Sequence, residues 1–128
     1  MKALLDTHTF LWWNMDDPQL SVSARELIAD GANEIFFSAA SAWEIALKAA
    51  KGRLSLPETP DKYIADRIHH YHFVPLPVLI SHAVEVFRLP EYHNDPFDRL
   101  LVAQGCMEDL AIITVDDQIK RYEVETIW

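Results

Sequence analysis

The chain has 128 residues, half of them hydrophobic and 24% charged, which is typical of a folded globular protein with a sizeable core. Acidic residues number 20 and lysines plus arginines 11, so the formal net charge is −9 and the surface does not favour general polyanion binding. A nuclease is not excluded, because bound divalent metal ions reverse the local field. The lone cysteine, Cys106, excludes an intramolecular disulfide and a cysteine-rich zinc site, and it indicates a cytoplasmic protein. Asp6 follows only five residues and no apolar stretch is long enough for a membrane span, so we expect neither a signal peptide nor a transmembrane helix.

The first half of the chain alternates short apolar runs with helical patterns. The predicted elements are a strand at 3–5, a helix at 7–13, a helix at 23–31, a strand at 34–37 and a helix at 41–50. Ser23 and Glu26 have the spacing of a capping box, which predicts the start of the second helix. Gly52 follows the third helix and favours its end.

The second half continues the same alternation. The predicted elements are helix 59–70, strand 73–76, helix 79–87, helix 96–107, strand 111–114 and a last short strand at 124–127. Pro60 and Pro96 suit the first turn of the helices that they open. Pro75 cannot donate a backbone hydrogen bond, so its strand is expected at an edge or to end there.

Short apolar strands separated by helices predict an α/β sandwich with a mostly parallel sheet. We find no linker, repeat or low-complexity segment, so residues 1–128 are expected to form one domain. In such sheets, ligands bind in the crevice beyond the carboxyl ends of the strands.

Four acidic residues are expected at that edge. Asp6 ends the first strand, and Asp116 lies two residues after the strand at 111–114. Glu44 and Asp98 lie in the first turns of helices, which in a parallel sheet begin at the same edge. The four carboxylates are therefore predicted to converge on one crevice.

Each of these acids also has an ordinary structural explanation. Asp6 can cap the helix that follows it, and Asp116 can be a turn residue. Ser41 and Glu44 have capping-box spacing, and Asp98 is an acid in the first turn of a helix. Only the set of four, taken together, favours a functional site.

Clustered carboxylates repel one another unless a cation lies between them. Carboxylate oxygens and water suit Mg²⁺ or Mn²⁺ rather than zinc, with one or two ions at the site. Such ions generate a nucleophile from water and stabilise a leaving oxygen, which suits the hydrolysis of phosphodiester bonds.

Each of the four acids lies in a short motif. The motifs are at 4–8 (Leu-Leu-Asp-Thr-His), 41–45 (Ser-Ala-Trp-Glu-Ile), 93–101 (His-Asn-Asp-Pro-Phe-Asp-Arg-Leu-Leu) and 113–116 (Ile-Thr-Val-Asp). Together they resemble the PIN-domain family, and most closely the VapC-type toxins of type II toxin–antitoxin modules. The resemblance covers essentially the whole chain, and the run at 95–101 is its most specific part.

The resemblance implies a three-layer α/β/α sandwich and an Mg²⁺- or Mn²⁺-dependent endoribonuclease that acts on RNA. It also implies a homodimer and a cognate antitoxin that blocks the site. Carried over by position, the catalytic and metal-binding residues are Asp6, Glu44, Asp98 and Asp116. Secondary candidates are Asp95, Thr114 and Asp117, the last as a substitute for its neighbour.

Three further residues near the expected crevice have open roles. Lys48 can contact RNA phosphates or pair with Glu44 four residues earlier. Arg99 can contact RNA, although a salt bridge to Asp98 is the favoured interpretation. His93 can act as a general base, but a metal-bound water makes that role unnecessary, so a capping or surface role is the favoured interpretation. The alternative to the ribonuclease is a catalytically weak PIN-fold protein that binds another protein.

Overall fold

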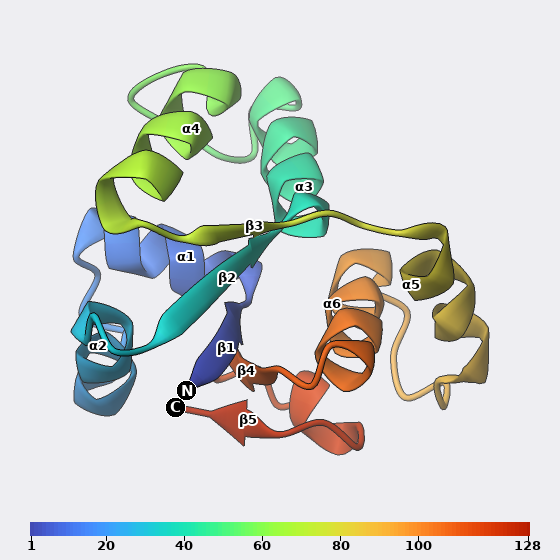
Figure 1. Ribbon diagram of the computed structural model, residues 1–128. Coiled ribbons are helices and arrows are strands. Elements are labelled where there is room, and N and C mark those ends of the chain that lie inside the picture. The colour runs from blue at the N-terminus through green and yellow to red at the C-terminus, as the bar shows by residue number, and fades with distance from the viewer.

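Five parallel strands form one central sheet in the computed structural model, which describes residues 1–128 (Figure 1). The strands are β1 (Lys2–Leu5), β2 (Glu34–Ser38), β3 (Val74–Leu76), β4 (Ala111–Ile113) and β5 (Thr126–Ile127). They lie in the order β3-β2-β1-β4-β5, and every neighbouring pair is parallel. The predicted α/β class is confirmed, and Pro75 lies in an edge strand as expected.

Helices connect the strands. They are α1 (Thr7–Met15), α2 (Val22–Ala29), α3 (Ala39–Ala50), α4 (Pro60–Tyr71), α5 (Ile80–Glu85) and α6 (Pro96–Met107), with the short 3-10 helices η1 (Val86–Arg88) and η2 (Ile119–Arg121). None of them combines the length and the apolar composition that crossing a membrane requires. The sequence pattern predicted all six α-helices but not η2.

The central part of the sheet is buried on both faces, which explains why Leu4 and Leu5 of β1 and all three residues of β4 are apolar. Successive side chains of a strand point to opposite faces. Leu5 packs in one core with Phe10 of α1, whereas Leu4 packs in a second core with Leu101 of α6. In Figure 1, α1, α2 and α4 cover one face and α5 and α6 the other, which makes the three-layer sandwich.

Two helices begin earlier than the sequence pattern predicted. The N-cap of α2 is Ser21, whose hydroxyl accepts from the Ala24 amide, and not Ser23. The N-cap of α3 is Ser38, so that helix begins at Ala39 rather than at residue 41. Glu44 therefore lies in the second turn of α3, and the predicted capping box with Ser41 is wrong.

The central position of β1 brings distant parts of the chain to one edge. Leu5 is in register with Ile113 of β4, and Leu4 with Phe36 of β2. The chain runs outward from β1 through β2 to β3 and then crosses back to β4, which lies on the other side of β1. The direction of the strand order therefore reverses at β1. Such a reversal opens a crevice at the carboxyl ends of the strands, where Asp6 and Thr114 follow β1 and β4.

Gly105 lies where α6 approaches the sheet most closely. A β-carbon there would lie 3.0 Å from Val124 Cγ2, 3.1 Å from the Leu110 carbonyl oxygen and 3.2 Å from Ile112 Cγ1. We expect Gly105→Ala to lower the free energy of unfolding by about 1–2 kcal/mol, because overpacking outweighs the gain in helix propensity. Urea denaturation checks this result. Gly31→Ala is the matched control, since nothing lies within 4 Å of the added carbon, and equal effects of the two substitutions would contradict the prediction.

Candidate active site

Asp6 forms the floor of the site. Its side chain is buried and caps α1, since Oδ1 accepts a 2.7 Å hydrogen bond from the Thr9 amide. Its Oδ2 accepts a short hydrogen bond from the Thr114 hydroxyl. Burial raises the pKa of the Asp6 carboxyl, and the hydrogen bonds from Thr114 and Thr9 oppose that rise. Asp6 is thus both a cap, as the structural explanation held, and a carboxylate fixed at the sheet edge.

Thr114 joins two of the predicted acids. While its hydroxyl donates to Asp6, its oxygen accepts a 3.0 Å hydrogen bond from the Asp116 amide. Asp116 is itself held by a 2.8 Å hydrogen bond from the Gln118 amide to its Oδ1. Thr114 therefore fixes the loop after β4 against the end of β1.

Thr114→Val is expected to lower the free energy of unfolding by about 1–3 kcal/mol, because the isosteric change leaves a buried carboxylate oxygen of Asp6 without a donor. Urea denaturation at neutral pH measures the change. Thr126→Val is the matched control, since that half-buried hydroxyl has no hydrogen-bond partner in the protein. A loss of stability no greater than that of the control would contradict the role given to Thr114.

Glu44 projects from the second turn of α3 and is 3% exposed. Its Oε2 lies 2.6 Å from Lys48 Nζ, which is the expected i,i+4 ion pair. Its Oε1 is buried and has no hydrogen-bond partner. A hydrogen bond from the Thr7 hydroxyl to Ser41, 2.9 Å long, ties α3 to α1 beside Asp6. One oxygen of Glu44 is therefore left for another ligand.

The charges of the other acids act on Asp98. Burial raises the pKa of its carboxyl to about 8, and the charges of Asp95, Asp116, Glu44 and Asp6 add to that rise. The raised pKa of Asp98 therefore agrees with the predicted convergence of Asp6, Glu44, Asp98 and Asp116, with Asp95 beside them. Asp95 is also the N-cap of α6, as its position before Pro96 indicated.

Two of these carboxylates are turned toward nitrogen donors of the protein. Glu44 pairs with Lys48, and Asp98 Oδ2 lies 3.2 Å from His93 Nε2. In this arrangement no three His, Cys, Asp or Glu side chains form a ready-made set of metal ligands. The donors nevertheless suit Mg²⁺ or Mn²⁺, because they are carboxylate oxygens that repel one another and one of them is buried without a partner.

Two of the predicted residues lie differently from what we expected. The side chain of Asp117 is 96% exposed and lies 3.8 Å from Lys120, so it does not join the acid cluster. Arg99 forms no ion pair with Asp98, and the favoured salt bridge is wrong. Its guanidinium instead donates to the Pro90 carbonyl and the Tyr122 hydroxyl. Contacts of Lys48 and Arg99 with RNA stay predictions.

Sequence reasoning missed the role of His93. Its side chain is 13% exposed, with Nδ1 2.8 Å from the Tyr122 hydroxyl oxygen and Nε2 against Asp98. The expected surface or capping role is therefore wrong. The five-residue spacing between His93 and Asp98 was the only available signal, because Tyr122 lies 29 residues further along the chain.

Two cavities flank the acid cluster. One of about 400 Å³ is lined by Trp43, His93, Asn94 and Arg99, among others. Another of about 310 Å³ includes Lys48. None of the four acids lines either cavity, but each cavity includes a residue that contacts one of them: His93 contacts Asp98, and Lys48 contacts Glu44.

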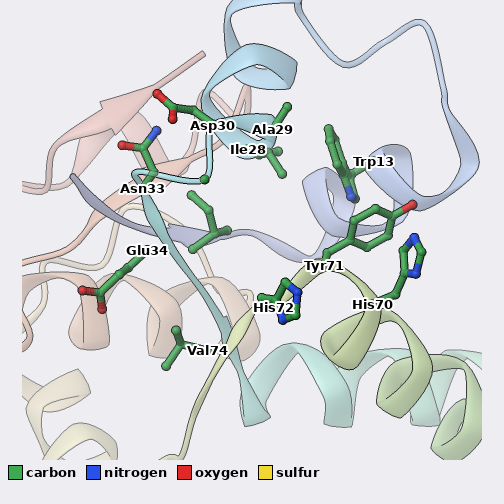
Figure 2. A pocket seen from close by; sticks show the side chains of 12 residues that line it. Trp13, Ile28, Ala29, Asp30, Asn33, Glu34, His70, Tyr71, His72 and Val74 are labelled. Atoms are coloured by element: carbon green, nitrogen blue, oxygen red, sulfur yellow. The ribbon is translucent and has the colours of Figure 1, made fainter.

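The largest cavity, about 590 Å³, lies at the opposite edge of the sheet. It lies at the start of β2 and β3, where Glu34 and Val74 begin those strands. Figure 2 shows Trp13 and Tyr71 on one wall and Glu34 on the other. None of the four predicted acids lines it, so size alone does not locate the chemistry.

Comparisons with known proteins match essentially the whole chain. A sequence model of the PIN domain matches residues 3–125. Ribonuclease VapC22 of Mycobacterium tuberculosis is 26% identical over 129 aligned positions, which cover 98% of each protein. Ribonuclease VapC16 of the same organism is 39% identical over 69 positions, covering 51% of this chain and 49% of that protein.

Solved structures share the fold. VapBC2 from Rickettsia felis, in a crystal structure bound to a DNA fragment from its promoter, matches with a TM-score of 0.72 and 15% identity, over 99% of this chain and 98% of that one. FitAcB from Neisseria gonorrhoeae matches with a TM-score of 0.66 and 19% identity, over 100% of this chain and 97% of that one. At these identities the likeness establishes the three-layer architecture.

Proposed function

The chain belongs to the PIN domain family, and from that premise we propose that residues 1–128 form one PIN domain that acts as a divalent-metal-dependent endoribonuclease. The raised pKa of Asp98 supports the proposal most directly, because the charges of Asp95, Asp116, Glu44 and Asp6 contribute to it and Asp6 and Glu44 are themselves buried. The similarity to two proteins named as ribonucleases supports RNA as the substrate. The family alone would not define the chemistry, since one fold serves many functions.

In this proposal Asp6, Glu44, Asp98 and Asp116 hold the cation. Thr114 fixes Asp6 and Asp116 relative to each other, and Asp95 fixes the start of α6. One or two Mg²⁺ or Mn²⁺ ions would supply a hydrolytic nucleophile from water and stabilise the leaving oxygen of the phosphodiester.

The cations beside the cluster suit the RNA backbone. Lys48 is 41% exposed and paired only with Glu44, so its ammonium can turn toward a phosphate when Glu44 turns toward a cation. Arg99 lines the neighbouring cavity. Because the net charge is −9, we expect weak binding to RNA in general and recognition of RNA shape or of an unpaired segment.

We also propose a homodimer and a cognate antitoxin as partners, acting in the cytoplasm. The resemblance to VapC-type toxins and the fold shared with VapBC2 support this proposal. Exposed apolar side chains on α5 and η1 provide a surface for a protein partner, with Ile80 84%, Val84 64% and Phe87 93% exposed. Light scattering of the purified chain measures its oligomeric state.

The test is RNA cleavage by the purified protein in EDTA, Mg²⁺ or Mn²⁺, with a thermal melt in each condition. We expect cleavage only with a metal ion, and a metal at 100 times its dissociation constant is expected to add about 2.7 kcal/mol of stability. The ion pair of Glu44 with Lys48 favours the rival, a catalytically weak protein-binding module, because it occupies one oxygen of a proposed metal ligand. Neither cleavage nor a metal-dependent shift in melting temperature would favour that rival.

A further inference from the structure

A chain of hydrogen bonds runs from Arg99 through Tyr122 and His93 to Asp98. Arg99 Nη1 lies 3.0 Å from the Tyr122 hydroxyl oxygen, which lies 2.8 Å from His93 Nδ1. His93 Nε2 lies 3.2 Å from Asp98 Oδ2. Tyr122 is 4% exposed, and the side chains of His93 and Asp98 are 13% and 18% exposed. Water therefore competes little for these bonds.

Arg99 sets the direction of this chain. Its guanidinium also donates to the carbonyls of Pro90, at 2.7 Å, and Val86, at 3.3 Å, which fix its position. A guanidinium has only donors, so the Tyr122 oxygen accepts from Arg99. The single hydroxyl hydrogen of Tyr122 is then free to donate to its other neighbour, His93 Nδ1.

The Tyr122 oxygen has a second lone pair, so the direction of its bond to Nδ1 is part of the proposal: when the Tyr122 hydroxyl hydrogen points to Nδ1, that nitrogen is an acceptor. A neutral imidazole carries one hydrogen, and when Nδ1 accepts, that hydrogen is on Nε2. Nε2 then donates to Asp98 Oδ2, and a carboxylate oxygen is an acceptor. Every donor in the chain thus meets an acceptor, and Asp98 Oδ1 is left without a hydrogen-bond partner in the protein.

We propose that Arg99, Tyr122 and His93 are positioning residues that lock His93 as the neutral Nε2–H tautomer and hold Asp98 by its Oδ2. The bond restrains the carboxylate through Oδ2 and leaves Oδ1 free to bind a cation. Groups that orient a metal-binding carboxylate in this way are typically worth about 10- to 100-fold in metal affinity. The expected effect of His93 on metal affinity rests on the proposed function. The assignment of the His93 tautomer does not depend on that function.

The tautomer is measured directly by long-range proton–nitrogen correlation spectra of the metal-free protein with ¹⁵N-labelled histidine at pH 8. His93→Gln assigns the His93 signals among the six histidines. We expect wild-type His93 to be neutral and protonated at Nε2, and Tyr122→Phe to give a mixture of tautomers. Protonation at Nδ1, protonation at both nitrogens, or an unchanged ring in Tyr122→Phe would overturn the proposal.

The positioning role is measured by Mn²⁺ titration calorimetry on two variants of His93. The amide of Gln reaches the place of Nε2 and can donate to Asp98, whereas the shorter Asn cannot. We expect His93→Gln to retain Mn²⁺ affinity within about threefold and His93→Asn to lose about 10- to 100-fold. His69→Gln, on the exposed side of α4, is the control that should not change.

Equal affinities of the Gln and Asn variants would reject positioning through Nε2, even if both fold normally. Absence of Mn²⁺ binding by the wild type would instead reject the proposed function. In that case the tautomer spectra still decide whether Arg99 and Tyr122 orient His93 toward Asp98, so the two failures are distinguishable.

Discussion

Asp6→Asn is expected to lower kcat/KM for RNA cleavage by more than about 100-fold while leaving the fold intact. Asp6 is fixed by Thr9 and Thr114 at the base of the acid cluster, so its charge has no nearby replacement. Substitution of a residue that only supports a metal ligand typically lowers metal affinity or activity by about 10- to 100-fold, and we expect the loss of a direct ligand to lower activity further. Asparagine is also a good N-cap, so α1 keeps its start. Cleavage rates with Mn²⁺, together with circular dichroism, measure both effects.

The matched control is Asp117→Asn. It makes the same chemical change one residue after Asp116, on a side chain that is 96% exposed and directed away from the cluster. We expect its cleavage rate to equal that of the wild type. Cleavage by Asp6→Asn at the wild-type rate would remove the proposed mechanism, and a loss of activity in Asp117→Asn would show that the last acid of the site is wrongly assigned.

The metal-free protein is expected to lose stability as the pH rises from 5 to 8. The pKa of Asp98 is about 8 in the folded protein, against 3.8 for an ordinary aspartate, because of its burial and the charges of the neighbouring acids. Between these values the folded state keeps a proton that the unfolded chain has released. The free energy of unfolding therefore falls with rising pH, and stability is greatest at the acidic end of the window. One pKa unit corresponds to about 1.4 kcal/mol, and partial solvation reduces the whole effect to about 3 kcal/mol.

Urea denaturation in EDTA at pH 5, 6, 7 and 8 measures this trend. Asp98→Asn removes the titrating group. Between pH 5 and pH 8 its free energy of unfolding should therefore fall by about 3 kcal/mol less than that of the wild type. Saturating Mn²⁺ should restore stability at pH 8, since a bound cation replaces the lost proton. Wild-type and Asp98→Asn curves with the same slope would show that Asp98 titrates normally.

The sequence predicted the elements well where local chemistry decides them. Asp95 and Pro96 specify the start of α6, and the predicted and observed bounds agree. Local chemistry is ambiguous where several hydroxyls compete, as with Ser21 and Ser23 or Ser38 and Ser41. There the packing of the whole helix selects the cap, and the predicted N-caps were wrong by two residues in α2 and by three in α3.

The convergence of the acids could be predicted from the parallel sheet. The hydrogen-bond partners of the residues around them could not. Only the folded chain brings Tyr122 to His93 and shows that Arg99 donates to Tyr122 rather than pairing with Asp98. These contacts depend on the loop before α6 and the turn after η2. No periodic pattern describes such segments, so the sequence carried no signal for the contacts.

The bond between Thr114 and Asp6 spans 108 positions of the chain, and this separation bears on when activity can arise during synthesis. β1, β2 and β3 emerge from the ribosome early, whereas β4 pairs with β1 only after residue 113 has left the exit tunnel. Such non-local pairing is slow and comes late in folding. A nascent chain shorter than this has Asp6 without Thr114 and Asp116, and its acid cluster is incomplete. We therefore expect a chain interrupted before residue 114 to lack the proposed activity, because it carries only part of the acid cluster.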